Sequence, residues 1–526
     1  VNVNGDKIAE LCKLPLSGLR KRLARVRLDD RQKKIASGSI EQVMKRVDCL
    51  IRMGLGYLTL DRNFSTLSGG EVQRVNLAGF LAADLRGSLY ALDEPTVGLH
   101  PCDRERLFDA LETLKERGNT VIVIGHDRKM LERANQILEL GPGGGRAGGE
   151  IVFQGTYEQI ISCDESLTGR YLSGHATVPS QKRRSAAGHL KIVGAHKHNL
   201  RDVTLRIPLG MFVCVTGVSG SGKSVLLRDV ICAALTGEND VLPPERKGYV
   251  AVEGADRIKQ VIFADHSSIS RSPRSVPLSY IGLYAKVREL FADVRAARLR
   301  GCRSTHFSFN AKAGRCPGCK GLGYVEIAMN LVPNVRMKCS ACEGKRFKDE
   351  MLQIHFRQKN IADVLDMTAD EAAEFFHELP EIESGLRALQ EVGLGYVQLG
   401  QPLGSLSRGE AQRLKLASSV VQGTGSDTLF LFDEPTAGLH FEDVRKLIDC
   451  FRKLIERGNS VIVAEHNMEL VRYADYVIDL GPGAGRSGGR VVARGTPRHI
   501  AQCKSSKTGT ALEAYLKCAR RSARTK

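Results

Sequence analysis

The chain has 526 residues, of which 42% are hydrophobic, enough to build the cores of two or more domains. The formal net charge of +18 favours a polyanionic partner, a nucleic acid before an anionic membrane surface. The sequence contains neither an apolar run of about 18 residues nor a charged-then-apolar leader, so we expect a cytoplasmic chain with no membrane partner.

The sequence carries an internal duplication. Asp93 matches Asp433 and His126 matches His466 at one offset of 340 residues, which indicates a repeated domain rather than a short-period solenoid. The matched stretches are "LSGGEVQR" (67–74) with "LSRGEAQR" (406–413), "SLYALDEPTVGLH" (88–100) with "TLFLFDEPTAGLH" (428–440), and "LGPGGGRAGG" with "LGPGAGRSGG".

A polar, basic and small-residue stretch, "TVPSQKRRSAAG", separates the two copies and is typical of a linker. We therefore expect residues 1–176 to be the later part of a first domain, 177–188 a linker, and 189–526 a second domain. These are called the first half and the second half below.

The second half opens with an apolar strand that runs into a glycine-rich turn and then a helical pattern, "MFVCVTGVSGSGKSVLLRDV". In a phosphate-binding loop the backbone N–H groups surround the phosphates, Lys223 reaches the β- and γ-phosphates, and the Ser224 hydroxyl ligates Mg²⁺. The residues expected to bind ATP here are Gly217, Ser219, Gly220, Ser221, Gly222, Lys223, Ser224 and Val225.

Two CxxC pairs, Cys316 with Cys319 and Cys339 with Cys342, are separated by nineteen residues. Four thiolates at this spacing can hold Zn²⁺ tetrahedrally and stabilise a segment that is too poor in apolar residues to fold unaided. Disulfides and idle thiols are the alternatives; a cytoplasmic chain disfavours the first and the regular spacing the second. We expect a structural zinc module at about 300–350, inserted in the second domain.

The sequence around the cysteines is basic. Such side chains suit phosphate contacts that position double-stranded DNA without reading its sequence, whereas a solvated basic face is the better explanation for any single residue. We expect the cluster as a whole to contact DNA. Its members are Arg271, Arg274, Arg295, Arg298, Arg300, Arg303, Lys312, Arg315, Lys320, Arg336, Lys338, Lys345, Arg346 and Lys348.

Two apolar strands of the second half end in polar side chains. "TLFLFDEP" ends in Asp433 and Glu434, and "VIVAEHN" brings His466 to the same edge of a parallel sheet, where ligands bind. We expect Asp433 to hold Mg²⁺, Glu434 to polarise the attacking water and His466 to contact the γ-phosphate.

A phosphate loop, "LS.GE.QR", "DEPT.GLH" and a strand that ends in histidine follow one another as in ATP-binding-cassette ATPases. With "GAHKHNL", "SRSPRSVP" and "FSFNAKAGRCPGC", the chain resembles the UvrA family, the DNA-damage recognition proteins of the ABC excinuclease. The resemblance implies an α/β P-loop NTPase fold, ATPase activity with no nuclease activity of its own, the cofactors ATP, Mg²⁺ and Zn²⁺, damaged double-stranded DNA as partner, a dimer, and a role in nucleotide excision repair.

The resemblance covers nearly the whole chain but corresponds to the later part of that family's chain. We therefore expect the family's earlier phosphate loop, further zinc modules and UvrB-binding insertion to be missing, so that a UvrB-like protein is a partner without its binding region. His266 stands where the family has glutamine, which puts the rate of hydrolysis in question, and Gly125 replaces a glutamate before His126.

In such cassettes the "LSGGE" segment closes over the nucleotide of the opposite half. The resemblance thus implies that Ser68, Gly69 and Gly70 complete one ATP site with Lys223, Glu434 and His466 as its catalytic residues. Arg408 degrades the other copy, which faces a half without a phosphate loop, so we expect a single complete site.

Two alternatives remain open at this point: a UvrA-like ATPase without an excision role, such as the self-protection proteins of antibiotic producers, and a non-catalytic, nucleotide-gated DNA-binding module. A transporter ATPase is disfavoured because transporter cassettes lack the zinc insertion.

Overall fold

The computed structural model describes residues 2–524 apart from 4–5, 27, 68, 146–147, 174–183, 238–246, 266–271, 328–334 and 424. Ser68, His266, Arg271 and residues 177–183 of the expected linker therefore lie outside the described residues.

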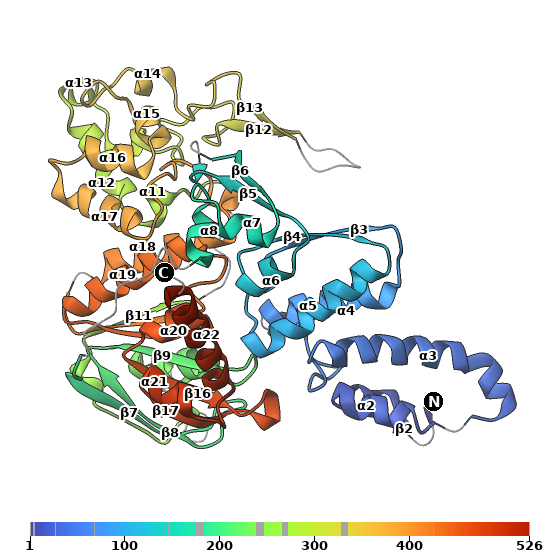
Figure 1. Ribbon diagram of the computed structural model, residues 1–526. Helices are drawn as coiled ribbons and strands as arrows, with labels where there is room; N and C mark the ends of the chain where they lie inside the picture. The colour runs from blue at the N-terminus through green and yellow to red at the C-terminus, as the bar shows by residue number, and fades with distance from the viewer. Residues whose placement is uncertain are drawn as a thin grey trace.

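A six-stranded sheet with the strand order β11-β14-β15-β9-β16-β17 lies at the centre of the second half (Figure 1). β17 runs antiparallel to β16, and the other neighbouring strands are parallel. The strands are β9 (Phe212–Gly217), β11 (Gln260–Ala264), β14 (Thr428–Asp433), β15 (Ser460–Ala464), β16 (Tyr476–Gly481) and β17 (Arg490–Gly495).

Both faces of this sheet are covered, which is why every residue of β9, β14 and β15 is buried. Phe430 and Phe432 pack on one face in a core shared with α18 (Arg408–Gln422) and α19 (Phe441–Glu456). The other face packs on the π-helix η3 (Val225–Cys232) and on an antiparallel sheet. That sheet has the order β10-β7-β8, with β7 (Gly188–Ala195), β8 (Val203–Leu209) and β10 (Ala251–Glu253).

Further helices complete the second half after η3 and around the last strands. They are α9 (Ala233–Leu235), α20 (Met468–Tyr473), α21 (Pro497–Gln502) and α22 (Lys507–Arg524).

A helical module lies between β11 and β14, and a hairpin of β12 and β13 stands out from it (Figure 1). The module contains α11 (Pro277–Tyr280), α12 (Tyr284–Asp293), α13 (Arg295–Leu299), β12 (Tyr324–Ile327), β13 (Val335–Lys338), α14 (Asp349–Leu352), α15 (Ile361–Asp366), α16 (Ala369–Phe375) and α17 (Pro380–Glu391). Its helices join the core that also covers the sheet.

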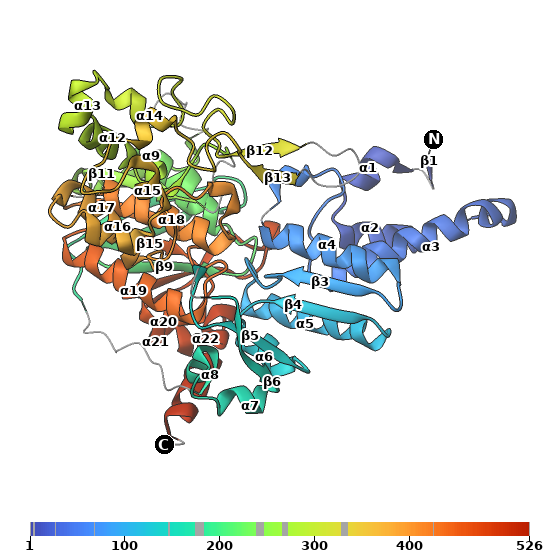
Figure 2. The same ribbon diagram turned by 90° about the horizontal axis from the view of Figure 1, so that it is seen from above.

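The first half lies beside the second, with α3 pointing away from it (Figures 1 and 2). Its described strands form three separate pairs: the antiparallel pair β1-β2, the parallel pair β3-β4 and the antiparallel pair β5-β6. The strands are β1 (Asn2–Val3), β2 (Asp6–Lys7), β3 (Leu89–Asp93), β4 (Thr120–Ile124), β5 (Ile137–Gly141) and β6 (Glu150–Gly155). The helices are α1 (Ile8–Cys12), α2 (Leu16–Leu23), α3 (Asp30–Arg52), α4 (Gly69–Ala83), α5 (Pro101–Glu116), α6 (Arg128–Arg133), α7 (Tyr157–Ile161) and α8 (Leu167–Leu172).

Comparison with the second half explains why the strands of the first half form separate pairs. β3, β4, β5 and β6 repeat β14, β15, β16 and β17, but the described residues of the first half hold no counterpart of β9, which joins β15 to β16. They hold no counterpart of β7, β8 or η3 either, so apolar side chains that are buried in one half are exposed in the other. Leu140 is 63% exposed and its repeat Leu480 is 1% exposed.

Among the described residues, none of the helices is both long and apolar enough to cross a membrane.

The repeat supplies a matched pair for testing this packing. Ile122 in β4 is 52% exposed, and its repeat Ile462 in β15 is fully buried. We expect Ile462→Lys to lower the free energy of unfolding by about 3 kcal/mol or more, because it buries an unpaired charge. Ile122→Lys should change it by less than about 0.5 kcal/mol. Urea unfolding of the two variants followed by circular dichroism measures both effects, and equal destabilisation would contradict the burial difference.

Candidate functional site

The loop between β9 and η3 leaves the sheet at the carboxyl edge of the parallel strands. Gly217 has a φ of 139°, and a Cβ there would overlap the carbonyl oxygen of Leu480, so only glycine fits. Gly220 and Gly222 also have positive φ values. The backbone therefore makes the tight turn that a phosphate loop requires, and Val225 begins the helix that follows it.

Two buried polar side chains of this loop suit a phosphate. The ammonium of Lys223 donates to the carbonyl oxygens of Gly217 at 2.9 Å and Val218 at 3.3 Å, which holds the charge over the loop. The Ser221 hydroxyl is buried and has no hydrogen-bond partner among the described residues. A buried hydroxyl without a partner is costly unless a ligand satisfies it.

Ser224 and Asp433 meet at the loop's end. The Ser224 hydroxyl donates to Oδ1 of Asp433 at 3.0 Å, and Asp433 is buried at the end of β14. Mg²⁺ prefers such oxygen ligands in combination with substrate phosphates, so this pair fits the ion.

Glu434 follows with a φ of 47°, and its repeat Glu94 has a φ of 48°. Non-glycine residues seldom adopt this left-handed conformation, and such strain concentrates at functional sites. The backbone thus turns both glutamates in the same unusual way.

His466 lies next to Glu434, with Nδ1 at 3.7 Å from Oε1. Nδ1 makes no hydrogen bond to any described residue. Burial lowers the pKa of His466 well below its usual value, and the positive charges of Arg104 and Lys223 add to this effect. The imidazole is therefore neutral at physiological pH.

Glu465, which precedes this histidine, holds it in place. Its buried carboxylate accepts hydrogen bonds from the Thr436 hydroxyl at 2.8 Å and from the backbone N–H of His466 at 2.8 Å. Burial raises the pKa of Glu465. Sequence reasoning did not include it, although Gly125 at the repeated position is a signal that the two halves differ here.

The first half contributes directly to this site. The Ser219 hydroxyl of the loop donates to the carbonyl oxygen of Gly98 at 2.9 Å. A Cβ on Gly98 would lie 3.1 Å from the Gly70 nitrogen and 3.4 Å from Oε2 of Glu434. Gly70 therefore lies beside Ser219 and Glu434, whereas the neighbouring Gly69 faces open space at the start of α4.

Tyr57 is a second contact that sequence reasoning missed. Its hydroxyl donates to Glu71 of the "LSGGE" segment. A Cβ on Gly220 would lie 3.2 Å from the Tyr57 hydroxyl oxygen, so the ring packs on the phosphate loop. Tyr396 stands at nearly the same place in the second copy, where it donates to Glu410 and packs on Gly144 and Gly145. The repetition of this tyrosine is the sequence signal that could have identified Tyr57.

The second copy of the "LSGGE" segment, "LSRGE" at 406–410, lies away from any phosphate loop that the described residues contain. Ser407 caps α18 and accepts a hydrogen bond from the Glu410 N–H at 3.2 Å, while Arg408 is exposed. The neighbouring pair is Glu94 and His126, whose Oε1 and Nδ1 atoms are 3.2 Å apart.

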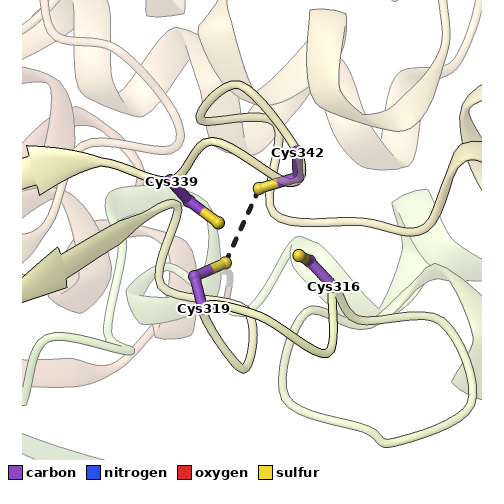
Figure 3. Close-up of side chains that lie close together, drawn as sticks. All are labelled: Cys316, Cys319, Cys339 and Cys342. Atoms are coloured by element: carbon purple, nitrogen blue, oxygen red, sulfur yellow. Dashed lines mark hydrogen bonds between the residues drawn. The ribbon is translucent and has the colours of Figure 1, made fainter.

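The four predicted cysteines converge in a second site (Figure 3). Their sulfur atoms all lie within 4.8 Å of one another, and Sγ of Cys319 is 3.6 Å from Sγ of Cys342. A tetrahedral Zn²⁺ with Zn–S bonds of about 2.3 Å places its sulfurs about 3.8 Å apart. Burial opposes ionisation of Cys339, but backbone N–H groups of Cys342 and Ala341 outweigh it and lower the pKa to about 7. The residues therefore fit a zinc ion.

The basic side chains near the cysteines divide into two groups. Lys320, Lys338 and Lys345 are exposed on or beside the hairpin. Arg346 differs from the expectation of a DNA contact, because it is half-buried, donates to the carbonyl oxygen of Gly400 at 2.7 Å and stacks on Phe309. The other exposed members are Arg295, Arg298, Arg300, Arg303, Lys312 and Arg336, and Arg274, Arg315 and Lys348 are half-buried.

Known proteins resemble this chain over most of its length. Residues 359–472 match the family described as "AAA domain, putative AbiEii toxin, Type IV TA system". UvrABC system protein A of Aquifex aeolicus is 44% identical over 98% of this chain and 56% of its own length. The protein of the same name from Thermus thermophilus is 46% identical over 95% of this chain and 53% of its own length.

The chain is homologous to UvrABC system protein A. The crystal structure of UvrA2 from Deinococcus radiodurans is 41% identical and covers 98% of this chain and 64% of that one, with a TM-score of 0.90. The predicted α/β P-loop NTPase fold is thereby confirmed.

The chain spans about half the length of the curated UvrABC system protein A relatives it matches. Its correspondence to the later part of the family's chain stays a prediction, as do the domain boundaries and the roles of the site residues.

The convergence of the four cysteines allows the predicted zinc binding to be tested by substitution. We expect Cys339→Ser to lose bound zinc and to lower the thermal stability of the module, because three thiolates and a hydroxyl bind the ion far more weakly. Cys302→Ser, which lies outside the cluster, should retain one zinc per chain. Elemental analysis of the purified proteins measures both, and zinc retained at full occupancy in Cys339→Ser would contradict the four-thiolate site.

Proposed function

We propose that this chain is an ATPase with one shared ATP site and that ATP controls its binding to damaged double-stranded DNA in nucleotide excision repair. The contact that carries the proposal is the hydrogen bond between Ser219 of the phosphate loop and Gly98 of the first half, with Gly70 and Glu434 beside it. The homology to UvrABC system protein A supports the repair role, and neither a self-protection role nor a purely non-catalytic module is favoured by these relatives.

Each side chain has a task that its position supports. Lys223 and the N–H groups of the loop bind the β- and γ-phosphates, and the Ser221 hydroxyl gains the acceptor that it lacks. Ser224 and Asp433 would hold Mg²⁺, which neutralises phosphate charge when bound.

We infer that Glu434 orients the attacking water and that the neutral His466 beside it contacts the γ-phosphate. The "LSGGE" segment, including Ser68, Gly69 and Gly70, closes over the γ-phosphate with the N–H groups of a helix start.

The zinc module and its hairpin are the proposed DNA contact. Cys316, Cys319, Cys339 and Cys342 would hold Zn²⁺ in a structural role, and the lysines beside them contact phosphates. We also propose two protein partners, a second copy of the chain and a UvrB-like protein; the relatives' name, UvrABC system protein A, supports the second of them.

The internal repeat provides the sharpest test of the ATP site. We expect Glu434→Gln to lower ATP turnover by about a hundredfold or more while ATP stays bound, because the variant cannot orient the attacking water. Glu94→Gln removes the repeated carboxylate and should leave turnover within about twofold. Lys223→Ala should instead weaken ATP affinity, by about tenfold or more, because a phosphate loses its charged partner. Steady-state ATPase assays and fluorescent-nucleotide titrations separate these effects; equal losses in Glu434→Gln and Glu94→Gln would refute the single site.

DNA binding should depend steeply on salt, because each neutralised phosphate releases counterions. We expect Lys338→Ala and Lys345→Ala each to weaken binding of a duplex and to reduce the slope of log K against log salt concentration by about 1. Lys191→Ala on β7, where Lys191 pairs with Glu253, serves as the control. Fluorescence anisotropy from 50 to 200 mM salt measures the slopes, and an unchanged slope in both module variants would place the DNA elsewhere.

A further inference from the structure

The histidine of "DEPTVGLH" lies at the boundary between the halves. His100 is fully buried at the N-terminus of α5, and its Nε2 is 3.2 Å from the hydroxyl oxygen of Thr508 in α22 of the second half. The two residues are separated by 408 positions in the chain. The ATPase proposal assigns no role to either of them.

The direction of the hydrogen bonds follows from their partners. Nδ1 of His100 accepts from the backbone N–H of Cys102 at 3.3 Å, and the Thr508 hydroxyl donates to Oδ1 of Asp479 at 2.7 Å. The proton of a neutral ring must therefore sit on Nε2 and point to Thr508. Burial lowers the pKa of His100 to about 3, with the charges of Lys223 and Arg104 adding to the effect, so the ring is neutral.

Asp479 continues the chain of hydrogen bonds to the phosphate loop. This buried carboxylate of β16 also accepts from the Thr216 hydroxyl at 2.9 Å and from the Ser506 hydroxyl at 2.7 Å. Thr216 directly precedes Gly217 in β9. The hydrogen bonds thus run from α5 of the first half to the strand that carries the loop. In addition, the backbone N–H of His100 donates to the Ser219 hydroxyl of the loop at 3.4 Å.

The duplication repeats this arrangement at the other end of the boundary. His440 lies 3.2 Å from the Thr168 hydroxyl oxygen, which donates to Oε1 of Glu139 at 2.6 Å. Nδ1 of His440 accepts from the Glu442 N–H at 3.4 Å. At this end the described residues of the first half present no phosphate loop, so the second set is a natural control for the first.

We propose that His100, Thr508 and Asp479 are positioning residues through which the first half holds the phosphate loop of the second half in the arrangement that hydrolyses ATP. The reason is physical: a buried hydrogen-bond chain with one allowed proton arrangement is satisfied only when both halves are in register. The proposal rests on the proposed ATPase function. It adds a chain of hydrogen bonds that couples the position of the first half to the conformation of the phosphate loop.

Isosteric substitutions in the full chain test the proposal. Thr508→Val keeps the shape and removes the hydroxyl, and we expect kcat to fall by about tenfold, since losing one such bond is worth roughly that factor. ATP affinity should change by less than twofold, because the loop itself is intact. Thr508→Ser should restore kcat, and Thr168→Val, the matched change in the repeat, should leave it unchanged.

A pair of substitutions at His100 separates the link from helix capping. Asparagine keeps an acceptor for the Cys102 N–H but is too short to reach Thr508, whereas glutamine places an N–H near the position of Nε2. We expect His100→Asn to lower kcat like Thr508→Val and His100→Gln to recover part of the loss. Two results would overturn the proposal: equal losses in Thr508→Val and Thr168→Val, or a fall in ATP affinity that accounts for the whole loss of turnover.

Hydrogen exchange gives a readout that does not need ATP turnover. Thr508→Val should speed exchange at the amides of residues 99–103 in the opposite half, and His100→Asn should speed it at residues 506–512. Unchanged exchange in both segments would overturn the link even if turnover fell. A wild-type chain that hydrolyses no ATP would instead refute the proposed function, while the exchange data would still decide whether the link exists.

Discussion

The insertion of β9 between β15 and β16 is the constraint on which the rest of the structure depends. Val215 pairs with Ala464 on one side, and Gly217 pairs with Leu480 on the other. Because all these strands are parallel, the loop after β9, Asp433 and His466 leave the sheet at the same edge. The position of the proposed nucleotide site is therefore a consequence of strand order, and Gly217 is the point where the sheet ends and the loop begins.

The first half shows what the same sequence pattern becomes without this strand. β3 with β4 and β5 with β6 keep the pairings of their repeats, yet they form two separate sheets. Leu140 and Ile122 face outward there, although their repeats are buried. The described strands of the first half thus keep their local pairing without a central strand, but their apolar side chains are not buried, because burial requires layers on both faces.

The first half, whose sheet is split, nevertheless contacts the proposed nucleotide site of the second half. Gly98 accepts from Ser219, Gly70 lies beside Glu434, and Tyr57 packs on Gly220. These contacts use loops and helix starts, which do not require an intact sheet behind them. The four thiols of the zinc module gather in a small cluster of their own, where a metal would replace a hydrophobic core.

The sequence by itself was sufficient to predict features whose residues lie close together in the chain. The phosphate loop, the two CxxC pairs and the strand-ending Asp433 and Glu434 are local patterns with a chemical reason for each residue type. The α/β fold followed from the same patterns. Only the tertiary structure could decide that Arg346 stacks on Phe309 instead of facing solvent, because composition carries no information on burial. The sequence likewise could not predict the contacts of Gly98 and Glu465 or the pairing of His100 with Thr508. Such contacts arise from the packing of segments that are distant in the chain.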